Sequence, residues 1–180
     1  GLDNNRMTRE SIQAILDIWN GADPGSYGGE FFNYTIPKFV ESNGQRLHVK
    51  PYQKPHPPIG VAGVSDYSST LKLAGQAGWI PMSINIVPPS HLKTHRSAIE
   101  EGAKLGGKTL DSSSWRIARD IFVADSTEEA LDGAINGTLG RDFRDYFFRY
   151  LPHTPYFRLL KTHEDMPDED VTLEYMAENV

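Results

Sequence analysis

Apolar residues recur along this chain with two different periods. Near the start they fall three and four positions apart, which predicts an amphipathic helix from a Thr8 cap to about Trp19. Further along, three short continuous apolar runs are typical of strands covered on both faces, at residues 59–63, 79–84 and 115–124. A helical pattern follows each run, so the sequence predicts three β/α units and a parallel sheet with right-handed crossovers.

Residues with capping chemistry delimit the three helices of these units. Hydroxyl side chains stand where each helix should begin, and glycines stand where the first two should end. The predicted limits are the turn at residues 64–69 and Gly78 for the first helix, Ser90 and Gly106 for the second, and Ser126, in a capping box with Glu129, for the third.

Between the N-terminal helix and the first unit the sequence predicts a hairpin. Residues 31–39 and 46–49 are strand-like, and the Asn43-Gly44 pair between them is a strong turn signal. Pro37 cannot donate a ladder hydrogen bond, so the first segment is expected to be an edge strand.

The turn at residues 64–69 is the strongest candidate for a binding site. It connects a buried strand to the start of a helix and carries several hydroxyl side chains. Free N–H groups and the helix dipole at such a position favour an anion, most often a phosphate. The alternative is a plain strand–helix connection whose serines only cap the helix.

Composition narrows the possible partners. The chain has 180 residues and a net charge of -6, whereas nucleic-acid binding calls for a clustered basic face. It has no cysteine, which excludes disulfides and cysteine-ligated zinc, and no apolar run approaches the roughly 20 residues of a membrane span. His91 and His95 have helical spacing but no adjoining acid, so we expect them on a solvated face and not at a metal. A cytoplasmic protein is the default expectation.

Three β/α units make an incomplete sheet. Eight parallel strands close a (β/α)8 barrel, and here a helix comes first with no strand before it. The chain is therefore expected to be part of a larger fold, with open strand edges that favour self-association into a homo-oligomer. The expected layout is one partial domain: an N-terminal helix over 1–21, a hairpin or insertion over 22–55, three β/α units over 56–137, and a lid-like helical segment with an acidic tail over 138–180.

The acidic tail offers little to a core. From Pro152 to Val180 the chain has three prolines (Pro152, Pro155 and Pro167), an acidic run and few core-forming residues. Such a composition does little to drive packing, so residues from about Glu164 onward are expected to be mobile or ordered only by a neighbouring chain.

Four motifs follow one another in an order that is similar to one known family. The chain resembles the bacterial luciferase-like, flavin-dependent monooxygenases over residues 6 to about 150, and its details are similar to the limonene and alkanal monooxygenase group. The stretches that carry the resemblance are RMTRESIQAILDIWNG, GEFF, VKPYQKPHPPIGVAGVSDYSSTLKLAGQAGWIP and WRIARDIFVADSTEEAL.

The resemblance implies an α/β fold that is part of a (β/α)8 TIM barrel, about strands 5–7 with their helices. It also implies that reduced FMN, usually supplied by a separate flavin reductase, works with O2 to oxygenate a small organic substrate. A related branch uses F420 for hydride transfer, and a non-catalytic flavin-binding or interaction domain is a further alternative. The cofactor carries the hard chemistry, so no metal or triad is required and no catalytic residue is assigned.

The phosphate of the cofactor would lie at the hydroxyl-rich turn. The resemblance points to the side chains of Ser65, Ser68, Ser69 and Thr70, with Gly63 allowing a close approach of the backbone. Asp66 stands where many members have another residue, and its charge predicts that it faces solvent.

The flavin ring would lie at the carboxyl ends of the strands. Met82, Ile84 and Asn85 are the residues that the resemblance brings near it, with ordinary barrel packing as the alternative for the first two. Arg116 and Arg119 are three apart on a predicted strand, so only one can face the interior. That arginine could hold a phosphate or the flavin, or could pair with a carboxylate such as Asp120.

An aromatic stripe precedes the tail. The resemblance makes Phe147 and Tyr150 candidates for a mobile lid over the substrate, because this stretch forms a lid in the family. The alternative is helix packing, which is the more frequent role of such a stripe. Its members are Phe143, Tyr146, Phe147, Phe148 and Tyr150.

Overall fold

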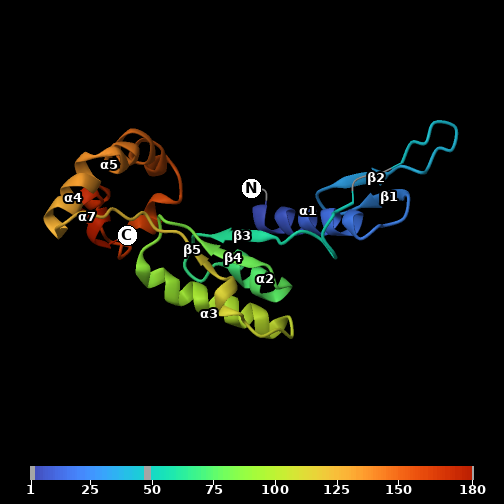
Figure 1. Cartoon of the computed structure of the whole chain (residues 1–180), viewed down its shortest axis with the longest axis horizontal. Coiled ribbons are helices and arrows are strands. Elements are labelled where there is room, and N and C mark those ends of the chain that lie inside the picture. The colour runs from blue at the N-terminus through green and yellow to red at the C-terminus, as the bar shows by residue number, and fades with distance from the viewer. Residues whose placement is uncertain (1–2, 47–49, 180) are drawn as a thin grey trace. The chain divides into compact units, whose positions relative to one another are not determined.

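The computed structural model describes residues 3–46 and 50–179. The chain divides into two compact units, Gly1–Pro58 and Ile59–Val180, each of which is described by itself (Figure 1). In the described part, no helix has the length and apolar character needed to cross a membrane.

The first unit begins with helix α1, Asn4–Trp19. Its cap is Asp3, whose carboxylate accepts from the backbone N–H groups of Asn5 and Arg6, both at 3.1 Å. The predicted start at Thr8 is therefore wrong by a full turn. The first residues of α1 are polar, so no apolar pattern marks them in the sequence, and the capping carboxylate of Asp3 stabilises this end of the helix.

A short antiparallel ribbon follows, formed by β1 (Gly25–Gly28) and β2 (Asn33–Ile36). The rings of Tyr27 and Tyr34 stack across it at 5.1 Å between centroids. The sequence missed β1 because its glycines and serine have low strand propensity. The predicted strand over 31–39 is thus shorter and pairs with an earlier segment than expected.

The Asn43-Gly44 turn is present where the sequence predicts it. Gly44 has a positive φ of 68°, and one isolated antiparallel bridge joins Val40 to Gln45 around the turn. The second strand predicted for this hairpin, residues 46–49, lies almost wholly outside the described residues.

The carboxylate of Glu10 ties α1 to the loop between β1 and β2. It accepts hydrogen bonds from the backbone N–H groups of Glu30, Phe31 and Phe32 at 2.8–3.1 Å. A Cβ atom at Gly29 would collide with this carboxylate, so the loop needs glycine there. Arg6 adds an ion pair to Glu30.

The second unit is built on a parallel sheet of three strands in the order β3-β4-β5. They are β3 (Gly60–Gly63), β4 (Ile80–Ser83) and β5 (Arg116–Ile117), joined through helices α2 (Ser69–Ala77) and α3 (Pro89–Leu105). This confirms the predicted α/β class with successive parallel units. The third predicted strand, 115–124, is wrong in length, because only its start pairs with β4.

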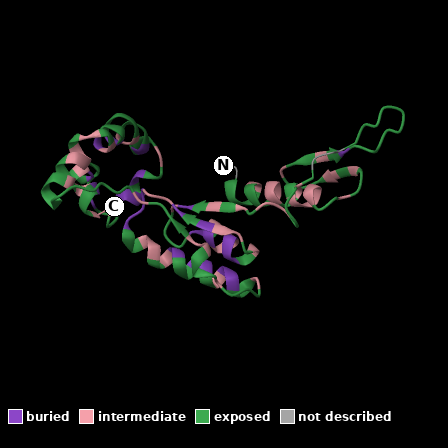
Figure 2. Ribbon diagram, viewed as in Figure 1, coloured by how far each residue is buried: buried purple, intermediate pink, exposed green. Residues whose placement is uncertain are grey.

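Helices α2 and α3 pack closely against each other and against the sheet (Figures 1 and 2). Side chains of Leu71, Ala74, Ala98 and Ile99 are fully buried between these elements. A Cβ atom at Gly102 would collide with the Lys72 carbonyl oxygen, so the helices touch backbone to backbone.

The helix ends agree with the capping prediction in most places. Ser68 caps α2, Gly78 closes it with a φ of 75°, and α3 ends at Leu105. The predicted Ser90 cap is wrong, because the N-cap of α3 is Pro88. Proline residues at the start of α3 already fix the backbone dihedral that a helix needs.

The remaining regular structure of the second unit is helical. It comprises a 3-10 turn at Ser112–Ser114, α4 (Thr127–Asn136), α5 (Thr138–Asp142), a π-helical turn at Phe143–Phe147, α6 (Phe148–Tyr150), 3-10 turns at Leu151–His153, Phe157–Leu160 and Asp168–Asp170, and α7 (Leu173–Asn179). Ser126 caps α4 by accepting from the Glu129 N–H at 3.2 Å, as predicted.

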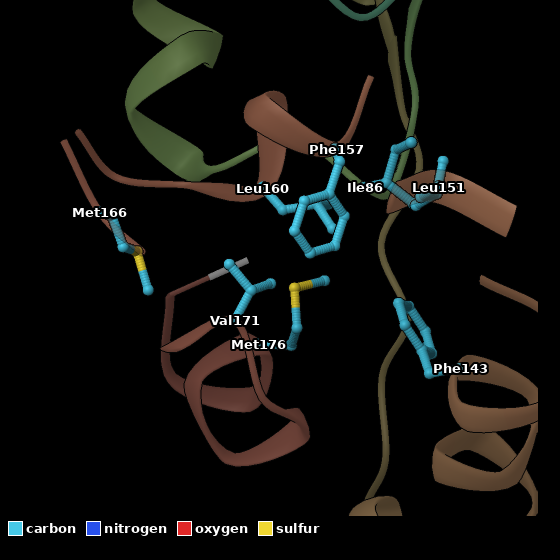
Figure 3. Packing of buried hydrophobic residues seen from close by; sticks show 8 residues of the cluster. All are labelled: Ile86, Phe143, Leu151, Phe157, Leu160, Met166, Val171 and Met176. Atoms are coloured by element: carbon cyan, nitrogen blue, oxygen red, sulfur yellow. The ribbon is translucent and has the colours of Figure 1, made fainter. Parts of the chain in front are cut away.

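The tail packs into a hydrophobic cluster (Figure 3). Its residues Met166, Val171 and Met176 are each at most 7% exposed and contact side chains from the preceding turns and the β4–α3 loop. The expected lack of packing after Glu164 is therefore wrong. Apolar residues spaced five apart in an acidic stretch match neither a helical nor a strand period, so the sequence pattern did not reveal them. The buried members are Ile86, Phe143, Leu151, Phe157, Leu160, Met166, Val171 and Met176.

Candidate functional site

The turn between β3 and α2 is held by a directed chain of hydroxyl groups. The Thr70 hydroxyl donates to the Ala62 carbonyl at 2.9 Å, so the Ser68 hydroxyl must donate to Thr70 Oγ1, also at 2.9 Å. Ser68 Oγ in turn accepts from the Leu71 N–H at 3.4 Å and is buried. Both hydroxyl protons are thus engaged within the protein: Ser68 is the N-cap of α2, and Thr70 connects the first turn of this helix to β3.

Gly63 is explained by the same packing. A Cβ atom at this position would lie 2.6 Å from Ser68 Oγ and would also overlap Leu71. Glycine is therefore required for the close approach of α2 to β3. Of the predicted turn residues, Ser65 and Ser69 are the ones with exposed side chains.

Two further contacts fix the middle of the turn. Tyr67 has a positive φ of 44°, and its backbone N–H donates to Thr94 Oγ1 of α3 at 3.1 Å. Its phenol hydroxyl bonds the Glu101 carboxylate, which also pairs with Lys72 at 2.6 Å. The side chain of Asp66, next to it, is exposed.

Ser65 and Asp66 line a cavity of about 470 Å³. Further lining residues come from the segment after Phe157 and include Arg158 and Lys161, which no sequence pattern identified. Lys161 is paired with Asp168 at 2.5 Å and only 12% exposed. The remaining lining residues are His91, Leu159, Thr162, His163 and Glu164.

Behind the turn lies a buried polar network centred on His95, which is 0% exposed. Its Nε2 atom is 2.9 Å from the Ser65 carbonyl oxygen and its Nδ1 atom is 2.9 Å from Ser83 Oγ. The indole N–H of Trp115 donates to the same Ser83 oxygen at 3.0 Å. The expectation of a solvated face is therefore wrong for His95, because α3 turns this side towards β4.

Burial also changes the acid–base behaviour of this histidine. Desolvation lowers the pKa of His95 below its usual value, and this effect outweighs the hydrogen bond to the Ser65 carbonyl, which acts to raise that pKa. Within residues 3–46 and 50–179 no group of three His, Cys, Asp or Glu side chains is placed to hold a metal.

A second cavity, of about 330 Å³, lies at the carboxyl ends of β4 and β5. Asn85 and Asp120 are two of its polar lining residues, and the Asn85 amide donates to the Asp120 carboxylate at 2.7 Å. The other lining residues come mainly from the later helices: Pro89, Ala134, Ile135, Leu139, Phe143, Leu173, Met176, Ala177, Glu178 and Asn179. Ligands of parallel α/β sheets usually bind at this edge.

Of the remaining predicted site residues, some pack inside the protein and others are exposed to solvent. Met82 lies beside Gly60 and is 37% exposed, and it does not line the second cavity. Ile84 packs against the hydrophobic cluster. Arg119 donates to the Val87 carbonyl at 2.6 Å, whereas Arg116 donates to the Ser113 carbonyl and is exposed.

The aromatic stripe behaves in part as helix packing. Phe147 packs against Phe143 at 4.9 Å between ring centroids, and only Phe143 of this pair lines the second cavity. Tyr150 is 59% exposed and stacks on Tyr146. Phe143 belongs to the predicted stripe, whereas Leu139, Leu173 and Met176 were missed and meet at the cavity only through the tertiary fold.

Known proteins align with this chain over most of its length. One curated relative, the 3,6-diketocamphane 1,6-monooxygenase of Pseudomonas putida, is 28% identical, with 98% of this chain matching 47% of that protein. Another, the 4-hydroxyprotoasukamycin monooxygenase of Streptomyces nodosus subsp. asukaensis, is 30% identical over 75% of this chain and 35% of its own length. The chain thus spans less than half the length of the curated relatives it matches.

Solved structures give the same picture. The oxygenating constituent of 3,6-diketocamphane monooxygenase from Pseudomonas putida, a type II Baeyer-Villiger monooxygenase in complex with FMN, superposes with a TM-score of 0.74 and 26% identity, covering 99% of this chain and 49% of that one. An F420-dependent secondary alcohol dehydrogenase, at 22% identity and a TM-score of 0.57 over 97% of this chain and 47% of that one, shares the fold. The profile of luciferase-like monooxygenases matches residues 3–174, and the chain belongs to that family.

Proposed function

We propose that this chain is a portion of an FMN-dependent monooxygenase that uses reduced flavin and O2 to oxygenate a small organic substrate. The observation that carries the proposal is the alignment of 99% of this chain with an FMN-complexed oxygenase at 26% identity. The strand–turn–helix element and the cavity at the strand ends support it, because they offer a phosphate position and a ring position at one edge of the sheet.

The phosphate would be held at the start of α2. Not all of the hydroxyl groups that the sequence predicted as ligands could donate to it. The hydroxyls of Ser68 and Thr70 are engaged inside the protein, so the phosphate would be held mainly by backbone N–H groups of the first turn, beside the exposed Ser69. Arg158, which lines the same cavity as Ser65 and Asp66, would supply a positive charge. These groups bind and orient the cofactor through its phosphate.

The ring would lie towards Asn85, where the chain supplies a polar group on an apolar background. Bound reduced FMN would supply the reaction with O2. The Asn85 amide, held by Asp120, can orient a polar group at a fixed place, while Leu139, Phe143 and Met176 exclude water from the apolar side of the cavity. The substrate would be small and mostly apolar to fill such walls.

Further parts of the proposal follow from the family. A separate flavin reductase would supply the reduced cofactor, and homo-oligomer formation would cover open strand edges. An F420-dependent oxidoreductase is the alternative enzyme, and a non-catalytic flavin-binding or interaction domain is the alternative from another class. The three alternatives differ in the cofactor that they use and in whether they form an oxygenated product.

The test is a turnover experiment on the full-length protein. It is supplied with FMN, a flavin reductase, NADH and a panel of cyclic ketones, terpenes and aldehydes under ¹⁸O2. We expect one labelled oxygen atom in the product, and no reaction when F420 replaces FMN. Hydride transfer with F420 and no label would favour the alternative enzyme, and flavin binding without any product would favour the binding domain.

A further inference from the structure

The buried network behind the turn is directional, and its direction fixes the state of His95. The Ser65 carbonyl can only accept, so Nε2 of His95 carries the proton and donates to it. The indole of Trp115 can only donate, so Ser83 Oγ accepts from it and has one proton of its own to give. Ser83 gives that proton to Nδ1, which is therefore the acceptor of a neutral imidazole.

This network reaches the turn from three elements at once. Ser83 ends β4, Trp115 directly precedes β5, and His95 lies in the middle of α3, so the bond to Ser65 connects the turn to the rigid sheet and helix. Ser65 itself lines the 470 Å³ cavity. A displacement of its backbone would move the cavity wall and the residues that lead into α2.

We propose that His95 is a positioning residue for the cofactor: its Nε2–H bond to the Ser65 carbonyl holds the turn in the shape that presents the start of α2 to the phosphate. The inference rests on the proposed function, since the phosphate is that of FMN. His95 touches only the protein and acts through the backbone of Ser65.

Protonation of His95 would disturb this arrangement at one specific bond. A proton on Nδ1 would reverse the bond to Ser83, which would then receive two donors and turn its own proton away from both present partners. The groups that face the imidazole are His91 on the same helix, Asp66 on the turn, Arg119 after β5, and the neutral Ser83 and Trp115. Burial opposes the charged imidazolium, as do His91 and Arg119, whereas the hydrogen bond to the Ser65 carbonyl and the nearby Asp66 favour it.

Two conservative substitutions separate the two bonds of the imidazole. His95→Gln places an amide N–H near the Nε2 position and keeps a donor for the Ser65 carbonyl. His95→Asn places its amide near the Nδ1 position, keeps a partner for Ser83 and loses the bond to Ser65. Neither side chain titrates, and both leave a polar group in the buried site.

The experiment measures the Kd of FMN and of riboflavin for the full-length protein between about pH 4 and 8, because burial lowers the pKa of His95 below the usual histidine value of about 6.5. At neutral pH we expect His95→Asn to weaken FMN binding about tenfold, as one lost hydrogen bond would, with His95→Gln near wild type and riboflavin little changed. On acidification, wild type should lose more FMN affinity than His95→Gln. The FMN phosphate also titrates, with a pKa of about 6, but it does so equally in both proteins.

The control is Arg96→Gln on the exposed side of α3, where Arg96 pairs with Glu100 at 2.8 Å. Circular dichroism checks that each variant is folded, and long-range ¹H–¹⁵N NMR spectra read the protonated nitrogen of His95 without any cofactor. Equal FMN affinity in both His95 variants, identical pH profiles for wild type and His95→Gln, or a proton on Nδ1 would overturn the inference. If wild type binds FMN no better than riboflavin, the proposed function fails first, while the NMR result still decides the direction of the network.

Discussion

A single carboxylate organises the loop of the first unit. Glu10 accepts hydrogen bonds from three consecutive backbone N–H groups. A capping side chain does the same at a helix N-terminus, but Glu10 is distant in sequence from the loop that it binds. Although desolvation acts to raise the pKa of Glu10, the hydrogen bonds from Phe32, Phe31 and Glu30 outweigh it and hold that pKa below its usual value. The ionised form is therefore the one that stabilises the folded unit.

This gives a pH dependence with a defined sign. Because the folded-state pKa of Glu10 is depressed, its contribution is fully present above the unfolded-state value of about 4.3 and is lost as pH falls through the folded-state value. We expect Glu10→Gln to lower the melting temperature near pH 7 and to show a smaller further loss on acidification than wild type. Thermal unfolding followed by circular dichroism between pH 3 and 7 measures both. The exposed Glu41→Gln serves as the control, and an equal effect of the two substitutions would contradict this role.

Residue roles at the turn illustrate what sequence could identify. The position of the turn and its N-cap could be predicted from the sequence, because a hydroxyl residue before a helical pattern is a local signal. The sequence could not predict which hydroxyl groups already have partners inside the protein, because the bond from Thr70 to the Ala62 carbonyl crosses the turn and depends on the fold. For the same reason the network of His95 could not be predicted, since Ser83 and Trp115 meet it only in the folded sheet.

At the scale of elements, the contact between α2 and α3 depends on glycine. A methyl group at Gly102 would meet the Lys72 carbonyl, and backbone atoms yield less readily than side-chain ends. We expect Gly102→Ala to reduce the free energy of unfolding by about 1–3 kcal/mol, although alanine is the better helix former. Urea unfolding measures the loss. The matched control, Ser97→Ala on the exposed face of the same helix, should change little, and a stabilised Gly102→Ala protein would disprove the close contact.

The helices and strands differ in how well the sequence predicts them. The end of α2 at Gly78 and the end of α3 at Leu105 follow from local backbone chemistry, so the pattern located them. The extent of β5 depends on a partner instead. Residues 118–124 continue the apolar pattern, yet pairing with β4 is limited to Arg116–Ile117. Dependence on a partner also explains β1, which pairs with β2 although its own sequence has low strand propensity.

At the scale of the whole molecule, the tail is part of the second unit's core. Met166 is 7% exposed in the cluster that Leu160 and Val171 also join. We expect Met166→Ala to cost about 2–5 kcal/mol in the free energy of unfolding, the range for large-to-small changes in a core. Denaturant unfolding checks this against Glu169→Ala, an exposed position nearby. Equal stability of the two variants would show that the tail is not packed.

The central claim is that the turn before α2 receives the phosphate of FMN, and charge at Ser69 tests it most directly. Ser69 is exposed, whereas Ser68 is a buried cap whose replacement would also disturb the fold. Charge-assisted hydrogen bonds to a phosphate contribute about 1.5–3 kcal/mol each, so a carboxylate beside the dianion should weaken FMN about tenfold or more. Ser112→Asp, at an exposed position in the turn before β5, provides the control.

The measurement is the Kd of FMN and of riboflavin, by quenching of flavin fluorescence, for full-length wild type, Ser69→Asp and Ser112→Asp. The account predicts that wild type prefers FMN, that Ser69→Asp loses this preference while keeping its affinity for riboflavin, and that Ser112→Asp matches wild type. An equal weakening of FMN and riboflavin in Ser69→Asp, or no weakening of either, would contradict the phosphate site and leave the hydroxyl-rich turn as a helix cap alone.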